Sequence, residues 1–106
     1  MKICVVGAGA IGGLMGAKLA LAGNDVTVID QGAHLQAIRE NGLKLIWEDG
    51  SEHVAQVKAV DKVADAGKQD LVILAVKAHF LDQVARESNA LMGPDTVIMT
   101  VQNGLP

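Results

Sequence analysis

The stretch Lys2-Ile3-Cys4-Val5-Val6 followed by Gly7-Ala8-Gly9-Ala10-Ile11-Gly12 decides the fold of this chain. A short apolar run that ends in Gly-x-Gly-x-x-Gly is typical of a buried strand that turns sharply into a helix. Gly7 permits the tight turn, Gly9 leaves the backbone open to a phosphate, and Gly12 lets the helix pack close to the strand. The helix predicted over 10–22 presents free N–H groups and its positive dipole end to an anion. The motif therefore predicts a pyrophosphate site.

The next segment supplies an acceptor for a ribose. Gly23 ends the predicted helix, and residues 25–30 read as a second buried strand that closes with Asp30, eighteen residues after Gly12. An acidic residue at this place can accept hydrogen bonds from the adenosine ribose hydroxyls of a dinucleotide. We therefore predict a dinucleotide site, with Gly7, Ala8, Gly9, Ala10, Ile11, Gly12 and Asp30 as contacts. The alternative is a glycine turn required only for packing.

Composition limits the class of protein. The 106 residues suffice for one domain, 1–106, and are few for a two-domain oxidoreductase. No uninterrupted apolar run reaches the roughly 18 residues of a membrane helix, and no secretory signal is evident, so we expect a cytoplasmic protein with no membrane partner. The net charge of −3 and the scarcity of aromatic residues argue against nucleic-acid binding. His34, His53 and His79 show no metal-ligand spacing, and the single Cys4 is expected to be a buried, inert thiol.

Further elements follow in alternation. The patterns predict a helix over 33–41, a hairpin of 43–47 and 53–57 around Asp49-Gly50, a short helix over 61–66, a strand over 70–76, a helix over 79–91 and a strand over 96–101. Strands that alternate with helices imply parallel βαβ units with right-handed crossovers. The fold class is therefore α/β, a doubly wound, mostly parallel sheet of the Rossmann type with an inserted β-hairpin. The glycine turn, Asp30, Lys77 and the segment 102–104 each follow a strand, so all should lie at the ligand-binding edge of the sheet.

Four separated motifs resemble one family. They are Gly-Ala-Gly-Ala-Ile-Gly-Gly at 7–13, the segment from His34-Leu35 to Asn41-Gly42-Leu43, Val76-Lys77-Ala78, and Gln102-Asn103-Gly104. In this order they resemble the amino-terminal domain of the ketopantoate reductases (2-dehydropantoate 2-reductases), over the whole chain. The resemblance implies hydride transfer from a nicotinamide cofactor to the ketone carbon of a small 2-oxo acid. In that family the general acid is a lysine on a second, helical domain, which this sequence does not contain.

The resemblance also implies roles for two residues. Lys77 would contact the cofactor, and Asn103 would lie against the nicotinamide ribose and the substrate; it is the only catalytic-site residue assigned in this chain. The alternatives are a solvated lysine and a plain Asn-Gly turn. Because no general acid is present, we expect the 106 residues to be part of a longer enzyme, to bind NAD(P)H and to be inactive alone.

The cofactor preference departs from the family norm, which is NADPH. The stretch Ile29-Asp30-Gln31-Gly32-Ala33 holds no basic residue for a 2′-phosphate, and a carboxylate at Asp30 would repel one. Local electrostatics therefore favour NADH, although Lys18 or Arg39 could reach round from a helix.

Two other functions stay open from the sequence. A nucleotide-sensing module of the kind that regulates potassium transporters would share the glycine turn and the acidic strand end, and the first segment of a flavoprotein is a weaker option. These 106 residues leave no sequence for a sixth strand, so we expect the strand over 96–101 to form an apolar sheet edge that favours pairing with another chain, such as a homodimer.

Overall fold

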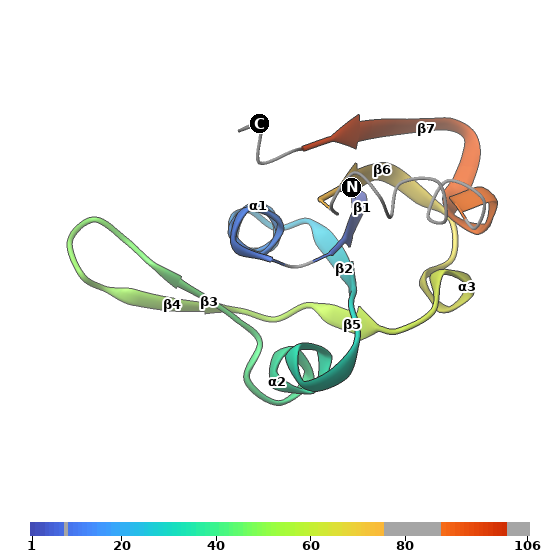
Figure 1. Cartoon of the computed structure of the whole chain (residues 1–106). Coiled ribbons are helices and arrows are strands. Elements are labelled where there is room, and N and C mark those ends of the chain that lie inside the picture. Colours follow the sequence, from blue (N-terminus) through green and yellow to red (C-terminus); the bar gives the residue numbers. More distant parts are fainter. Residues whose placement is uncertain (8, 76–87, 102–106) are drawn as a thin grey trace, which may run out of the picture.

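The computed structural model describes residues 1–7, 9–75 and 88–101 of the chain. Five parallel strands form one sheet in the order β5-β2-β1-β6-β7, and β3 and β4 form a separate antiparallel pair (Figure 1). The strands are β1 Lys2–Val6, β2 Asp25–Ile29, β3 Leu43–Ile46, β4 Glu52–Ala55, β5 Lys58–Val60, β6 Gln69–Leu74 and β7 Met92–Thr100. The helices are α1 Ala10–Leu21, α2 Gly32–Asn41, α3 Val63–Ala66 and a 3₁₀ helix, Ser88–Leu91. The predicted α/β class, a mostly parallel Rossmann sheet with an inserted hairpin, is confirmed.

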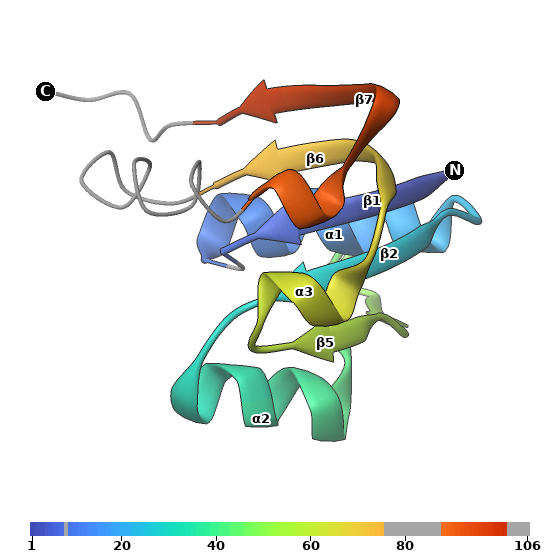
Figure 2. The same ribbon diagram turned by 90° about the vertical axis from the view of Figure 1, so that its right-hand side faces the viewer.

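Both faces of the sheet are covered over its central strands, which explains the continuous apolar runs in these strands. Ile3 and Val5 of β1 belong to the cluster under α1 and the hairpin, whereas Cys4 and Val6 belong to a second cluster with α3. Figures 1 and 2 show α1 and the β3–β4 hairpin on one side of the sheet, α3 on the other, and α2 beside β5. Burial raises the pKa of the Cys4 thiol to about 12, which fits the inert thiol expected from the sequence.

The carboxyl ends of four strands lie in register. Val6 of β1 is paired with Ile29 of β2 and with Leu74 of β6, and Leu74 is paired with Thr100 of β7. Residues that directly follow these strands therefore emerge at one edge of the sheet, as the sequence predicted. This edge lies at the left end of the strands in Figure 2.

Three predicted elements differ from the structure. Residues 58–60 form β5, a strand that the sequence analysis does not assign, and the hairpin strand before it stops at Ala55 rather than 57. The strand predicted over 96–101 begins already at Met92, and its pairing with β6 shifts register between Gln69 and Leu71. Most of the helix predicted over 79–91 falls outside the described residues, and its last four residues form the 3₁₀ helix.

The last strand has exposed apolar side chains. Val97 is 61% exposed, and Ile98 and Met99 are also exposed on this edge strand. The apolar edge predicted from the sequence is therefore present, while the homodimer that it suggested stays a prediction.

Candidate nucleotide-binding site

The glycine turn joins β1 to α1 as the motif requires. Gly7 has a φ of +87°, a backbone conformation that favours glycine, and its N–H donates to the Ile29 carbonyl at 2.9 Å. Gly9 is the N-cap of α1, and no side chain caps that helix end or places an acid in its first turn. Ala10 and Ile11 are described through their backbone in α1, and Ala8 lies outside the described residues. The N–H groups of this first turn are thus available to an anion.

The second and third glycines of the motif have different surroundings. A Cβ at Gly12 would collide with the Gly7 carbonyl and would lie 2.9 Å from the Ala75 Cβ. A Cβ at Gly9 would meet no protein atom within 4 Å. Close packing therefore explains Gly12, but it does not explain Gly9, where open space adjoins the helix end.

Asp30 follows β2 at the same edge and is held on three sides. Its N–H donates to the Val60 carbonyl at 3.1 Å, and its Oδ1 accepts the Gln31 N–H at 2.8 Å. Its Oδ2 lies 2.7 Å from Nδ1 of His34, in the first turn of α2. A carboxylate has about four lone-pair sites, so it can accept several hydrogen bonds at once.

His34 is the site residue that the sequence analysis missed. The sequence analysis considers His34 only as a metal ligand, and its spacing from the other histidines does not fit that role. The signal that could have found it is the spacing of four residues from Asp30, which spans the junction of β2 and α2.

A hollow of about 620 Å³ joins these features on one side. Gly9 and Gly13 line it from the start of α1, His34 from α2 and Lys44 from β3. The hollow is thus continuous from the glycine turn to the imidazole that contacts Asp30.

Two predicted site residues, Lys77 and Asn103, lie outside the described residues. The ends of their preceding strands are described, because the Ala75 N–H donates to the Val6 carbonyl and the Val101 N–H to the Leu74 carbonyl, each at 2.9 Å. The chain therefore leaves β6 and β7 at the same edge as the glycine turn, and the contacts of both side chains stay predictions.

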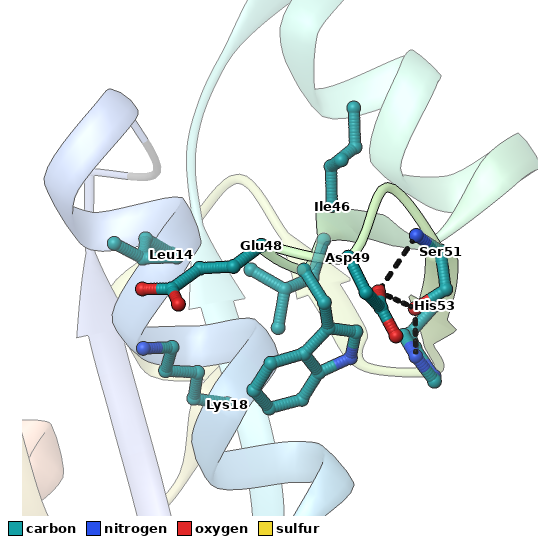
Figure 3. A pocket seen from close by; sticks show the side chains of 9 residues that line it. Leu14, Lys18, Ile46, Glu48, Asp49, Ser51 and His53 are labelled. Carbon is teal, nitrogen blue, oxygen red and sulfur yellow. Dashed lines mark hydrogen bonds between the residues drawn. The ribbon is translucent and has the colours of Figure 1, made fainter.

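A second hollow, of about 670 Å³, lies between α1 and the hairpin, with Leu14, Lys18 and Trp47 in its lining (Figure 3). The Lys18 Nζ stands 5.9 Å from the centre of the Trp47 ring, and that ring meets the His53 ring edge to face at 5.4 Å. At the hairpin turn the Ser51 Oγ donates to the Asp49 Oδ1 at 2.6 Å and lies 3.2 Å from the His53 Nε2. The two hydrogen bonds that Ser51 donates, from its hydroxyl and its N–H, hold the pKa of Asp49 below its usual value.

The described residues contain neither a candidate metal site nor a membrane-spanning helix. In 1–7, 9–75 and 88–101, no group of three His, Cys, Asp or Glu side chains could hold a metal ion. Over the same ranges, no helix is long and apolar enough to cross a membrane.

Comparisons with known proteins match the whole chain. The family model described as ketopantoate reductase PanE/ApbA matches residues 3–106. A 2-dehydropantoate 2-reductase of Mesorhizobium japonicum is 50% identical over 100% of this chain and 32% of its own length. The chain thus spans about a third of the length of this curated relative.

Solved structures agree on the fold. The crystal structure of a candidate ketopantoate reductase from Ralstonia solanacearum has a TM-score of 0.88 and 48% identity, over 99% of this chain and 32% of the other. The ternary structure of a D-mandelate dehydrogenase with NADH and anilino(oxo)acetate has a TM-score of 0.83 and 34% identity, over 100% of this chain and 35% of the other. These similarities favour the reductase over the potassium-transporter module and the flavoprotein. The chain belongs to the ketopantoate reductase family.

Proposed function

We propose that this chain binds a nicotinamide dinucleotide at the edge formed by the glycine turn and Asp30, as the nucleotide-binding part of a reductase for a small 2-oxo acid such as ketopantoate. The observation that carries the proposal is the open space around Gly9. The fold gives this position no reason to lack a side chain, since a Cβ there would touch no protein atom. A phosphate seated on the uncapped end of α1 supplies that reason.

The residues at the edge fit the cofactor. The free N–H groups of the first turn of α1 would hold the pyrophosphate without a basic side chain. Asp30 would accept hydrogen bonds from the adenosine ribose. Lys77 would reach a cofactor hydroxyl or phosphate, and the amide of Asn103 would hold the nicotinamide ribose and the substrate by donating and accepting.

We propose NADH as the preferred cofactor. The carboxylate of Asp30 would repel a 2′-phosphate, and the two cations that the sequence left as alternatives have other contacts. Lys18 stands over the Trp47 ring, and the Arg39 Nε donates to the Ala59 carbonyl at 3.0 Å. The related D-mandelate dehydrogenase was solved with NADH, which supports this preference.

Reduction of a ketone requires a proton donor in addition to the binding residues named above. When bound, the reduced nicotinamide supplies the hydride that adds to the ketone carbon. The proton for the developing alkoxide needs a general acid, and the roles proposed for Lys77 and Asn103 are to bind and to position. We therefore propose that the 106-residue chain binds the cofactor and does not turn over substrate alone.

The test is calorimetric titration with NADH for wild type, Gly9→Ala and Gly93→Ala, together with titration of wild type with NADPH. Gly9→Ala should raise the Kd about tenfold or more, because its Cβ would hold the phosphates off N–H donors worth about 1.5–3 kcal/mol each. Gly93 is the matched control, since a Cβ there would also fit, with its nearest contact at 3.6 Å to the Thr96 Oγ1, at the start of β7.

Three outcomes would overturn parts of this proposal. Wild type that binds neither NADH nor NADPH would refute the site. Equal losses in both glycine variants would refute the role of Gly9. Tighter binding of NADPH than of NADH would keep the site and refute the cofactor preference.

A further inference from the structure

The carboxylate of Asp30 is held in one orientation before any ligand binds. The bond from its N–H to Val60 fixes the backbone, and the Gln31 N–H and the His34 Nδ1 each contact a different carboxylate oxygen. The side chain of Asp30 is 20% exposed, so it is reachable from solvent while its rotation is restrained.

His34 is placed to act on Asp30 rather than to complete the fold. Its side chain is 51% exposed, and the neighbouring residues of α2 that pack into the core are Leu35 and Ile38. To contact a carboxylate oxygen at 2.7 Å, Nδ1 must carry the proton. The ring also lines the hollow that begins at Gly9 and Gly13. A ribose that bridges the glycine turn and Asp30 would therefore lie beside this imidazole.

We propose that His34 is a positioning residue for cofactor selection, which fixes the Asp30 carboxylate for the two ribose hydroxyls of NADH. This inference rests on the proposed function. A protein side chain that is already ordered loses less conformational freedom when a ligand binds. The contact from His34 therefore favours binding through Asp30, although His34 itself does not touch the cofactor. It also keeps the carboxylate where a 2′-phosphate would meet its charge.

The experiment measures the Kd values of NADH and NADPH for wild type and five variants. His34→Ala removes the contact, and His34→Asn keeps a donor, because the Asn Nδ2 follows Cγ as Nδ1 does in histidine. Asp30→Ala and the double variant Asp30→Ala/His34→Ala complete a mutant cycle. His53→Ala is the control, since this exposed histidine belongs to the hairpin and contacts Ser51 and Trp47.

His34→Ala should raise the Kd of NADH about 2- to 10-fold, which corresponds to the ordering of one or a few side-chain torsions. The Kd of NADPH should stay the same or fall, so the ratio of the two constants should change. His34→Asn should recover most of the NADH affinity. In the Asp30→Ala background the loss of His34 should change the Kd by less than about twofold, because nothing remains to be positioned.

Several results would overturn the inference. A wild-type chain that binds no nucleotide would refute both the inference and the proposed function. Binding that is normal in wild type and unchanged in His34→Ala would refute the role of His34 and leave the function standing. Equal losses for NADH and NADPH, or the same loss with and without Asp30, would show that His34 acts on the fold or directly on the ligand.

Discussion

Two regions of this molecule bring an aspartate and a histidine together by short polar contacts. Asp30 and His34 meet where β2 passes into α2, and Asp49 and His53 both contact Ser51 at the turn of the hairpin. The residue types are alike in the two places, but the first pair is in direct contact at 2.7 Å, whereas Ser51 links the second. Only the first pair stands beside a helix end that no side chain caps.

The difference lies in what surrounds each pair. Asp30 follows a strand whose last four residues are buried, and the Val60 carbonyl fixes its backbone. Asp49 lies in an exposed turn, where the Ser51 hydroxyl and N–H satisfy one of its oxygens locally. The hairpin pair therefore stabilises a turn, and the strand-end pair is rigid, reachable and aimed at a common edge. The role of a side chain therefore depends on the secondary-structure element that carries it as well as on its residue type.

The largest effect that we expect concerns the stability of the two turns after a glycine is replaced. Gly12→Ala should lower the free energy of unfolding by about 3 kcal/mol, the upper part of the usual range for overpacking, because its Cβ would meet the Gly7 backbone. Gly50→Ala in the hairpin should cost about 1 kcal/mol, since its φ of +84° disfavours alanine but a Cβ there meets nothing within 4 Å. Urea unfolding measures both. A Gly12→Ala variant as stable as wild type would show that the strand-end turn is as tolerant as the hairpin.

The next test compares the two carboxylates as ligands. Asp30→Asn should raise the Kd of NADH about tenfold, because a charged acceptor of ribose hydroxyls is replaced by a neutral amide. It should also reduce the discrimination against NADPH, since the repulsion of a 2′-phosphate disappears. Asp49→Asn, with the same change of charge in the hairpin, should leave both constants within about twofold of wild type. Calorimetric titration decides, and equal effects of the two substitutions would remove the functional distinction between the pairs.

The sequence predicted the elements that have a clear pattern over several consecutive residues. The glycine motif, the buried runs of β1, β2 and β6 and the Asp49-Gly50 hairpin each repeat a clear period or turn pattern, and their order determined the parallel sheet. The edge strand β5 was missed because three residues are too few to show a period of two, and because it follows the hairpin after only two residues. Pairing with β2, a contact distant in sequence, makes Lys58–Val60 a strand.

The sequence predicts Asp30 as a residue of the candidate site but does not predict its contact with His34. Asp30 follows from its place after a buried strand, which can be recognised along the chain. The contact from His34 depends on how α2 leaves the sheet, through Gly32 with a φ of +66°, and the spacing of four residues from Asp30 does not by itself determine that direction. The motif already assigns different roles to Gly9 and Gly12, and the structure adds how a Cβ would fit at each position.

The smallest effect expected is the response of the hairpin pair to acid. Ser51 donates two hydrogen bonds to the ionised Asp49, so the pKa of this carboxyl is lower in the folded protein than in the unfolded chain. Its contribution to stability is therefore complete above the unfolded pKa, about 4, and is lost as the pH falls through the lower, folded pKa.

Asp49→Asn cannot be ionised, so the difference in unfolding free energy between wild type and this variant isolates the contribution of the charge. That difference should favour wild type at neutral pH and shrink below about pH 4. Repeating the comparison in a Ser51→Ala background removes the hydroxyl donor and should flatten the pH dependence, because the first cause of the lowered pKa is gone. A difference that stays constant from neutral pH into acid would mean that the hydrogen bonds at the hairpin do not distinguish the charged from the neutral carboxyl. The charge of Asp49 would then not stabilise the hairpin turn, and the structural role that distinguishes this pair from Asp30 and His34 would be lost.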